Sequence, residues 1–152
     1  MRDNFIRVAA ATPEIKVADV AYNKEQICAC VEEAAARKAK IIVLPELCLT
    51  GYTCNDLFLQ TPMLEAAKEA LLELAAYSAD KDVLMAVGLP YEVRNRLYNA
   101  AALICRGKLL AMVTKTHLPM YSEFYETRHF APGPEAVEWI RIQNAAGEWE
   151  DI

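Results

Sequence analysis

Short apolar runs alternate with segments of helical periodicity, and this alternation constrains the fold more than any other feature of the sequence. The apolar runs at residues 5–11, 41–44 and 83–89 are predicted strands. The amphipathic segments between them are predicted helices, from Asn23 to Ala39 and from Thr61 to Ser78. A helix between two strands normally returns the chain to a parallel neighbour and packs on one face of the sheet. The pattern therefore predicts an α/β fold with both helices on the same face.

Local signals set the expected ends of two of these elements. Asn23, with Gln26 three residues later, suits a helix N-cap and predicts that the first helix begins there. The run at residues 41–44 is apolar at every position and ends at Pro45, which predicts a strand buried on both faces.

Antiparallel strands are expected in the second half of the chain. Residues 97–105 and 108–114 flank Arg106-Gly107, a two-residue turn that predicts a hairpin and makes the sheet mixed. Residues 137–142 and 148–152 are predicted to begin a further hairpin, which the chain leaves incomplete.

Composition excludes several classes of function. The chain has 152 residues, 55% of them hydrophobic, and a net charge of −5, which suits a soluble globular domain and disfavours binding to nucleic acid or to an anionic membrane. Its apolar stretches are far shorter than the roughly 18 residues that span a membrane. Five cysteines without a secretory signal predict reduced thiols and a cytoplasmic location.

Charged groups follow predicted strands at three places, where open α/β sheets carry their sites. Glu46 follows the apolar run at residues 41–44, Lys115 follows the hairpin, and a proline-bounded loop at residues 118–126 contains two carboxylates among three aromatic residues. A partly desolvated glutamate suits a general base, and a facing lysine suits an oxyanion. Spacing alone leaves open a solvated glutamate, a lysine that protects a strand edge and an ordinary packed loop.

Two longer motifs that contain these residues change the interpretation. Residues 45–58 and 115–126, supported by Leu97-Tyr98-Asn99 and by the turn at Arg106-Gly107-Lys108, resemble the nitrilase (carbon–nitrogen hydrolase) superfamily. More narrowly, they are similar to the amino-terminal glutaminase domains of glutamine-dependent NAD⁺ synthetases. The resemblance implies a nitrilase-like α-β-β-α sandwich that is incomplete at its C-terminal end.

The resemblance also implies a role for individual residues. Glu46 matches the family's general base, Lys115 its oxyanion-stabilising lysine, and Glu126 a second glutamate that orients them. Tyr121 matches a tyrosine of the glutamine pocket, and Tyr52 is a weaker candidate for the same wall. The implied reaction is attack of a cysteine thiol on the side-chain amide of glutamine, release of ammonia and hydrolysis of the thioester.

The family's nucleophilic cysteine has no match in this sequence, and no metal site is expected. Cys48 and Cys54 flank the Glu46 loop and are the remaining candidates for a substitute nucleophile, with His117 as a conceivable base. The resemblance favours a packing or surface role for His117 and His129. The other cysteines are Cys28, Cys30 and Cys105.

Residues 1–152 are therefore expected to be a partial carbon–nitrogen hydrolase domain, inactive alone. It would need no cofactor and would supply ammonia from L-glutamine to a synthetase domain that the sequence lacks. ATP and Mg²⁺ are expected to act in that synthetase domain, and the chain is expected to form a homo-oligomer. The alternatives are a stand-alone nitrilase-type amidase acting on another amide and a non-catalytic remnant.

Overall fold

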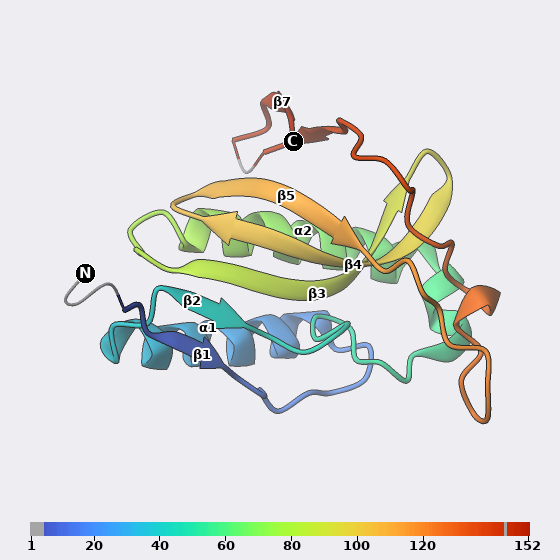
Figure 1. The fold of residues 1–152 in the computed structure, drawn as a ribbon, viewed down its shortest axis with the longest axis horizontal. Helices are drawn as coiled ribbons and strands as arrows, with labels where there is room; N and C mark the ends of the chain where they lie inside the picture. The colour runs from blue at the N-terminus through green and yellow to red at the C-terminus, as the bar shows by residue number, and fades with distance from the viewer. Residues whose placement is uncertain (1–4, 145) are drawn as a thin grey trace.

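A five-stranded mixed sheet with two helices behind it forms most of the structure (Figure 1). The computed structural model describes residues 5–144 and 146–152. The first three strands are parallel, the last two continue antiparallel, and the order in the sheet follows the chain. The five strands are β1 (Val8–Ala10), β2 (Ile41–Val43), β3 (Leu84–Val93), β4 (Arg96–Cys105) and β5 (Lys108–Thr114). The predicted mixed sheet with both helices on one face is confirmed.

Both helices cross over between parallel strands, as predicted. They are α1 (Val20–Ala36) and α2 (Thr61–Tyr77), and α2 carries Pro62 in its first turn, where the missing N–H costs nothing. Ile27 and Val31 of α1, and Leu71 and Leu74 of α2, are among the side chains buried in the core. The described part of the chain contains no helix with the length and apolarity needed to span a membrane.

The predicted start of the first helix is wrong. Asp19 is the N-cap, since its carboxylate accepts a hydrogen bond from the Tyr22 main-chain N–H at 3.1 Å. Asn23 lies inside the helix and is fully buried. Its side-chain oxygen accepts a hydrogen bond from the Lys16 main-chain N–H. Its Nδ2 donates to the carbonyl of Lys16 and to the carbonyl of Leu49, the latter at 3.1 Å. Asn23 thus fastens α1 to the loops that follow β1 and β2.

Within residues 5–144 and 146–152, the two helices cover one face of the sheet and leave apolar residues of the other face exposed. Ile42 and Met85 point into the core beneath the helices. By strand register, Val8, Val43 and Val113 share the opposite face and are exposed, Val43 by 51%. The prediction that β2 is buried on both faces is therefore wrong, and β1 is shorter than the predicted strand at residues 5–11.

Two tight turns connect the antiparallel strands. Arg106 and Gly107 have φ of 48° and 82°, which confirms the predicted hairpin between β4 and β5. A second hairpin, between β3 and β4, turns at Arg94-Asn95 with φ of 50° and 60°. This hairpin was not predicted. The expected strand stopped at residue 89, whereas β3 continues through Pro90, which lies opposite Asn99.

The chain after β5 runs along the end of the sheet and returns above β5 (Figure 1). It contains the short helix η2 (Glu126–Arg128) and a hairpin of β6 (Arg141–Gln143) and β7 (Trp149–Asp151); a further short helix, η1 (Asn55–Leu59), precedes α2. The main chains of Ile140 and Ile152 exchange two hydrogen bonds of 3.1 and 3.0 Å. The predicted hairpin is present, although its first strand is shorter than residues 137–142.

Candidate active site

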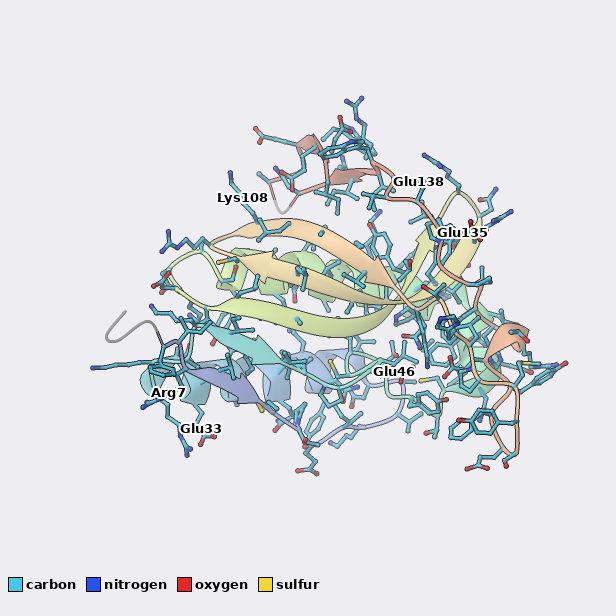
Figure 2. All side chains as sticks on the ribbon, in the orientation of Figure 1. Arg7, Glu33, Glu46, Lys108, Glu135 and Glu138 are labelled. Carbon is cyan, nitrogen blue, oxygen red and sulfur yellow. The ribbon has the colours of Figure 1, made fainter. Side chains whose placement is uncertain are left out.

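Three sequence-predicted residues meet at one end of the sheet. It is the end toward which β2 and β5 run (Figure 1), where Figure 2 labels Glu46. Glu46 follows β2, Lys115 follows β5 and Glu126 opens η2. The Lys115 Nζ lies 2.7 Å from Oε1 of Glu46 and 2.9 Å from Oε1 of Glu126. The ammonium therefore bridges the carboxylates of Glu46 and Glu126, which are 80 residues apart in the chain.

Close backbone packing holds the Glu46 loop. The main-chain N–H groups of Leu44 and Leu49 donate to the carbonyls of Ala86 and Gly88 in β3, at 3.0 and 3.1 Å. A Cβ on Gly88 would lie 2.5 Å from the Leu47 nitrogen and nearer still to the Pro45 carbonyl oxygen. Only glycine at this position lets the loop approach the strand so closely.

The main chain of Lys115 is held on both sides. Its N–H donates to the Asn99 carbonyl at 2.8 Å, and its carbonyl accepts from the Gly133 N–H at 2.9 Å. A Cβ on Gly133 would overlap Oγ1 of Thr114. The main chain of Lys115 is therefore fixed. Only the side-chain torsions have to be ordered for the ammonium to reach the carboxylates.

Glu126 is the most buried of the three charged residues, with 6% of its side chain exposed. Its Oε1 accepts hydrogen bonds from Lys115 and from the Tyr52 hydroxyl, the latter at 2.7 Å. Its Oε2 is buried and has no hydrogen-bond partner among the described residues. A buried carboxylate of this kind requires a nearby cation, which Lys115 supplies.

The electrostatics of the cluster keep the lysine charged. Burial lowers the pKa of Lys115, but hydrogen bonds and charge attraction from Glu46 and Glu126 outweigh it, so the pKa lies above its usual value of 10.5. Burial, followed by the hydrogen bond to Glu126, raises the pKa of Tyr52, which therefore remains a donor. The arrangement offers a fixed cation and a half-exposed carboxylate at the same point.

Asn99 belongs to the same cluster, and sequence reasoning gave it no role. Its side-chain amide donates to Oε1 of Glu46. The available signal was a lone polar residue within the otherwise apolar strand at residues 97–105.

Tyr121 lies apart from the three charged residues. It is 68% exposed, and its ring meets Phe124 edge-on with centroids 5.5 Å apart. The Tyr52 ring also meets Phe124 edge-on, with centroids 6.4 Å apart. Tyr52, Phe124 and Glu126 help to line a cavity of about 540 Å³, and Tyr121 is outside its wall.

An ion cluster forms part of the wall of this cavity. Arg128 donates two hydrogen bonds of 2.8 Å to the carboxylate of Asp56, and Nε2 of His129 lies 3.0 Å from the same group. The Arg128 hydrogen bond, followed by that of His129, holds the pKa of Asp56 well below its usual range. His129 packs against Phe58, while His117 is exposed, as expected for packing and surface residues.

Neither cysteine near Glu46 is suited to nucleophilic attack. Cys48 and Cys54 are buried, and their thiols lie within hydrogen-bond distance of main-chain carbonyls of Gly88 and Thr50. Burial raises the pKa of Cys48 to about 12 and also raises that of Cys54. A nucleophilic cysteine needs the opposite environment, exposed and electropositive. Residues 5–144 and 146–152 contain no cluster of three or more potential metal ligands.

Thiol labelling checks this assignment directly. In the native 152-residue chain, Cys28, Cys30 and Cys105 are expected to react with a disulfide reagent, because they are only half-buried. Cys48 and Cys54 should react only on unfolding, since both are buried and protonated at neutral pH. Mass spectrometry of the labelled peptides gives the rate for each residue, and rapid native labelling of Cys48 would contradict the assignment.

The topology is that of an α/β domain, and the glutamate–lysine–glutamate cluster lies at the strand ends, where such domains carry their sites. The sequence pattern of the carbon-nitrogen hydrolase family matches residues 7–146, and the chain belongs to this family.

Relatives and solved structures agree with this assignment. The glutamine-dependent NAD(+) synthetase of Mycobacterium tuberculosis is 42% identical over 145 residues, covering 93% of this chain and 21% of that protein. The synthetase of Aquifex aeolicus is 40% identical over 133 residues, covering 88% of this chain and 23% of its own length. The chain thus spans about a fifth of the length of these relatives.

The crystal structure of a glutamine-dependent NAD(+) synthetase from Cytophaga hutchinsonii superposes with a TM-score of 0.85 at 31% identity, covering 96% of this chain and 24% of that one. An amidase from Nesterenkonia shares the fold, with a TM-score of 0.73 at 22% identity, covering 98% of this chain and 55% of that one.

Proposed function

We propose that this chain is the glutamine-hydrolysing part of a glutamine-dependent NAD⁺ synthetase and supplies the ammonia for amide formation. The observation that carries the proposal is the Lys115 ammonium held between Glu46 and Glu126, in a chain 42% identical to a synthetase of that name. In this proposal residues 1–152 are part of a carbon–nitrogen hydrolase domain. ATP and Mg²⁺ act in a separate synthetase domain.

Each proposed role follows from the position of the side chain. Glu46, half-exposed, takes the proton from an attacking cysteine thiol as the new carbon–sulfur bond forms. Lys115, held charged, stabilises the negative oxygen that develops on the amide carbon. Glu126 holds Lys115 in place, and the Tyr52 hydroxyl in turn holds Glu126.

The remaining steps return the site to its starting state. The carbon–nitrogen bond breaks as Glu46 passes its proton to the nitrogen, and ammonia leaves. Water then attacks the thioester carbon, Glu46 accepts a proton from that water, and glutamate leaves as the thiol regains a proton. The thiols of Cys48 and Cys54 are buried and poorly placed for the attack, and the family motifs match none of the five cysteines to the nucleophile. The proposed nucleophile is therefore a further cysteine.

Two further aspects of the proposal concern the chain's surroundings. Self-association is proposed because Val8, Val43 and Val113 leave one sheet face apolar and exposed. A cytoplasmic location is proposed because all five cysteines are free.

The decisive test uses the natural polypeptide that carries residues 1–152, with NAD⁺ formation measured from glutamine and, separately, from ammonium. Glu46→Gln is expected to reduce the glutamine-dependent rate by at least about 100-fold because the proton acceptor is lost, while the ammonium-dependent rate remains. Glu65→Gln, which changes an exposed glutamate of α2, is the matched control. Full glutamine-dependent activity in Glu46→Gln would contradict the proposal.

Ammonia release also tests the competing functions. Release of ammonia from another amide in preference to glutamine would indicate a stand-alone amidase. The 152-residue chain alone is expected to release no ammonia from glutamine. If it does so and Cys48→Ala or Cys54→Ala stops it, the nucleophile assignment is wrong.

A further inference from the structure

Asn99 is the one neutral side chain, among the described residues, that donates a hydrogen bond to Glu46. It lies in β4 and is only 4% exposed, so its amide is isolated from competing water. A buried amide that binds a carboxylate makes a charge-assisted hydrogen bond, which is stronger than one between neutral groups.

The hydrogen bonds to Glu46 converge on one oxygen. Both Nδ2 of Asn99 and Nζ of Lys115 donate to Oε1. The other oxygen, Oε2, receives no hydrogen bond from the described residues, and 42% of the side chain is exposed. Oε1 is therefore occupied, and Oε2 is the oxygen free to accept a proton.

The same residue also fixes the lysine. The carbonyl of Asn99 accepts the main-chain N–H of Lys115 at 2.8 Å, at the point where β5 ends. Asn99 thus contacts Glu46 through its side chain and Lys115 through its main chain. Because β4 is a central strand paired on both sides, this connection is part of a rigid element.

We propose that Asn99 is a positioning residue that occupies Oε1 of Glu46, so that proton transfer takes place at Oε2, and that sets the distance between Glu46 and Lys115. The role in proton transfer rests on the proposed function, whereas the hydrogen bond itself is independent of it. Without the amide, the carboxylate can rotate and turn either oxygen toward Lys115.

The first test is nuclear magnetic resonance of the 152-residue chain, using the side-chain amide signals of Asn99. These signals are expected to shift as acid protonates their carboxylate partner, and to lose this transition in Glu46→Gln. Asn23 is the matched control, because its buried amide binds main-chain groups that do not titrate. The proposal is overturned if the Asn99 signals show no acid transition or keep it in Glu46→Gln.

The second test measures glutamine hydrolysis by the natural polypeptide carrying Asn99→Leu or Asn99→Asp, relative to the ammonium-dependent rate of the same preparation. Loss of a hydrogen bond to a charged group predicts a fall in kcat of about 10- to 100-fold, with KM changed by less than about threefold. The acidic limb of the pH–rate profile should also move, and more in Asn99→Asp, which puts a second carboxylate beside Glu46.

A purely structural role gives a different result. Lower stability with an unchanged kcat and an unchanged pH profile would overturn the positioning role. If wild-type protein hydrolyses no glutamine, the proposed function fails, and the resonance experiment still decides the hydrogen bond.

Discussion

Lys115→Met is expected to reduce glutamine hydrolysis by the natural polypeptide by about 10³-fold. In the 152-residue chain, the same substitution is expected to lower the free energy of unfolding by about 2 kcal/mol. The catalytic loss follows from removing the cation that faces the developing oxyanion. The loss of stability follows because Glu126, 6% exposed, loses the ammonium that compensates its buried carboxylate. The estimate lies below the cost for a fully buried pair because Lys115 and Glu46 are partly exposed.

A double-mutant cycle separates this charge effect from lost packing. Glu126→Gln removes the buried charge, so Lys115→Met combined with Glu126→Gln should cost less than the sum of the two single substitutions. Urea denaturation of the four proteins gives the coupling free energy. Additive costs would show that Lys115 and Glu126 do not stabilise each other.

The pH dependence of this contribution has a defined direction. Because the pKa of Lys115 is raised in the folded chain, its stabilisation is complete below about 10.5 and is lost as the pH rises through the higher folded value. The difference in unfolding free energy between wild type and Lys115→Met should therefore be constant at neutral pH and shrink in strong alkali. A difference that falls between pH 6 and 8 would indicate another titrating group.

The order of elements was predictable because periodicity reports burial locally. The amphipathic stretch from Thr61 to Ser78 became α2 within one residue, and Arg106-Gly107 turns as its composition predicts. The predictions were wrong where residues distant in the sequence determine the local structure. Asn23 resembles a cap in sequence, but Leu49 and Lys16 lie close enough to bind it inside the helix.

In the candidate site, too, the features set by local sequence were predicted, and the features set by distant residues were not. The position of Glu46 and Lys115 after strands suggested a shared sheet edge, and the family motifs brought in Glu126. Asn99 was not assigned because a polar residue in a strand has no local signature of its partner, which lies 53 residues earlier. The half-exposed Val43 was equally unpredictable, because an apolar run does not reveal whether a second layer covers it.

Gly88→Ala is expected to destabilise the chain by about 3 kcal/mol and to displace the Glu46 loop. The added Cβ would lie 2.5 Å from the Leu47 nitrogen and even closer to the Pro45 carbonyl oxygen. Both are main-chain atoms, so no side-chain rotation relieves the overlap. The loop must move away from β3, which weakens the bond from the Leu49 N–H to the Gly88 carbonyl.

Gly147→Ala is the matched control, because a Cβ there meets no atom within 4 Å and the substitution acts only through the strain of φ near 80°. That strain costs about 1 kcal/mol, so the two variants should differ by about 2 kcal/mol in urea denaturation. Displacement of the loop should also speed native labelling of Cys48, whose thiol lies 3.5 Å from the Gly88 carbonyl oxygen. Equal stability of the two variants, with Cys48 still protected, would mean that the Glu46 loop does not depend on the close approach at Gly88.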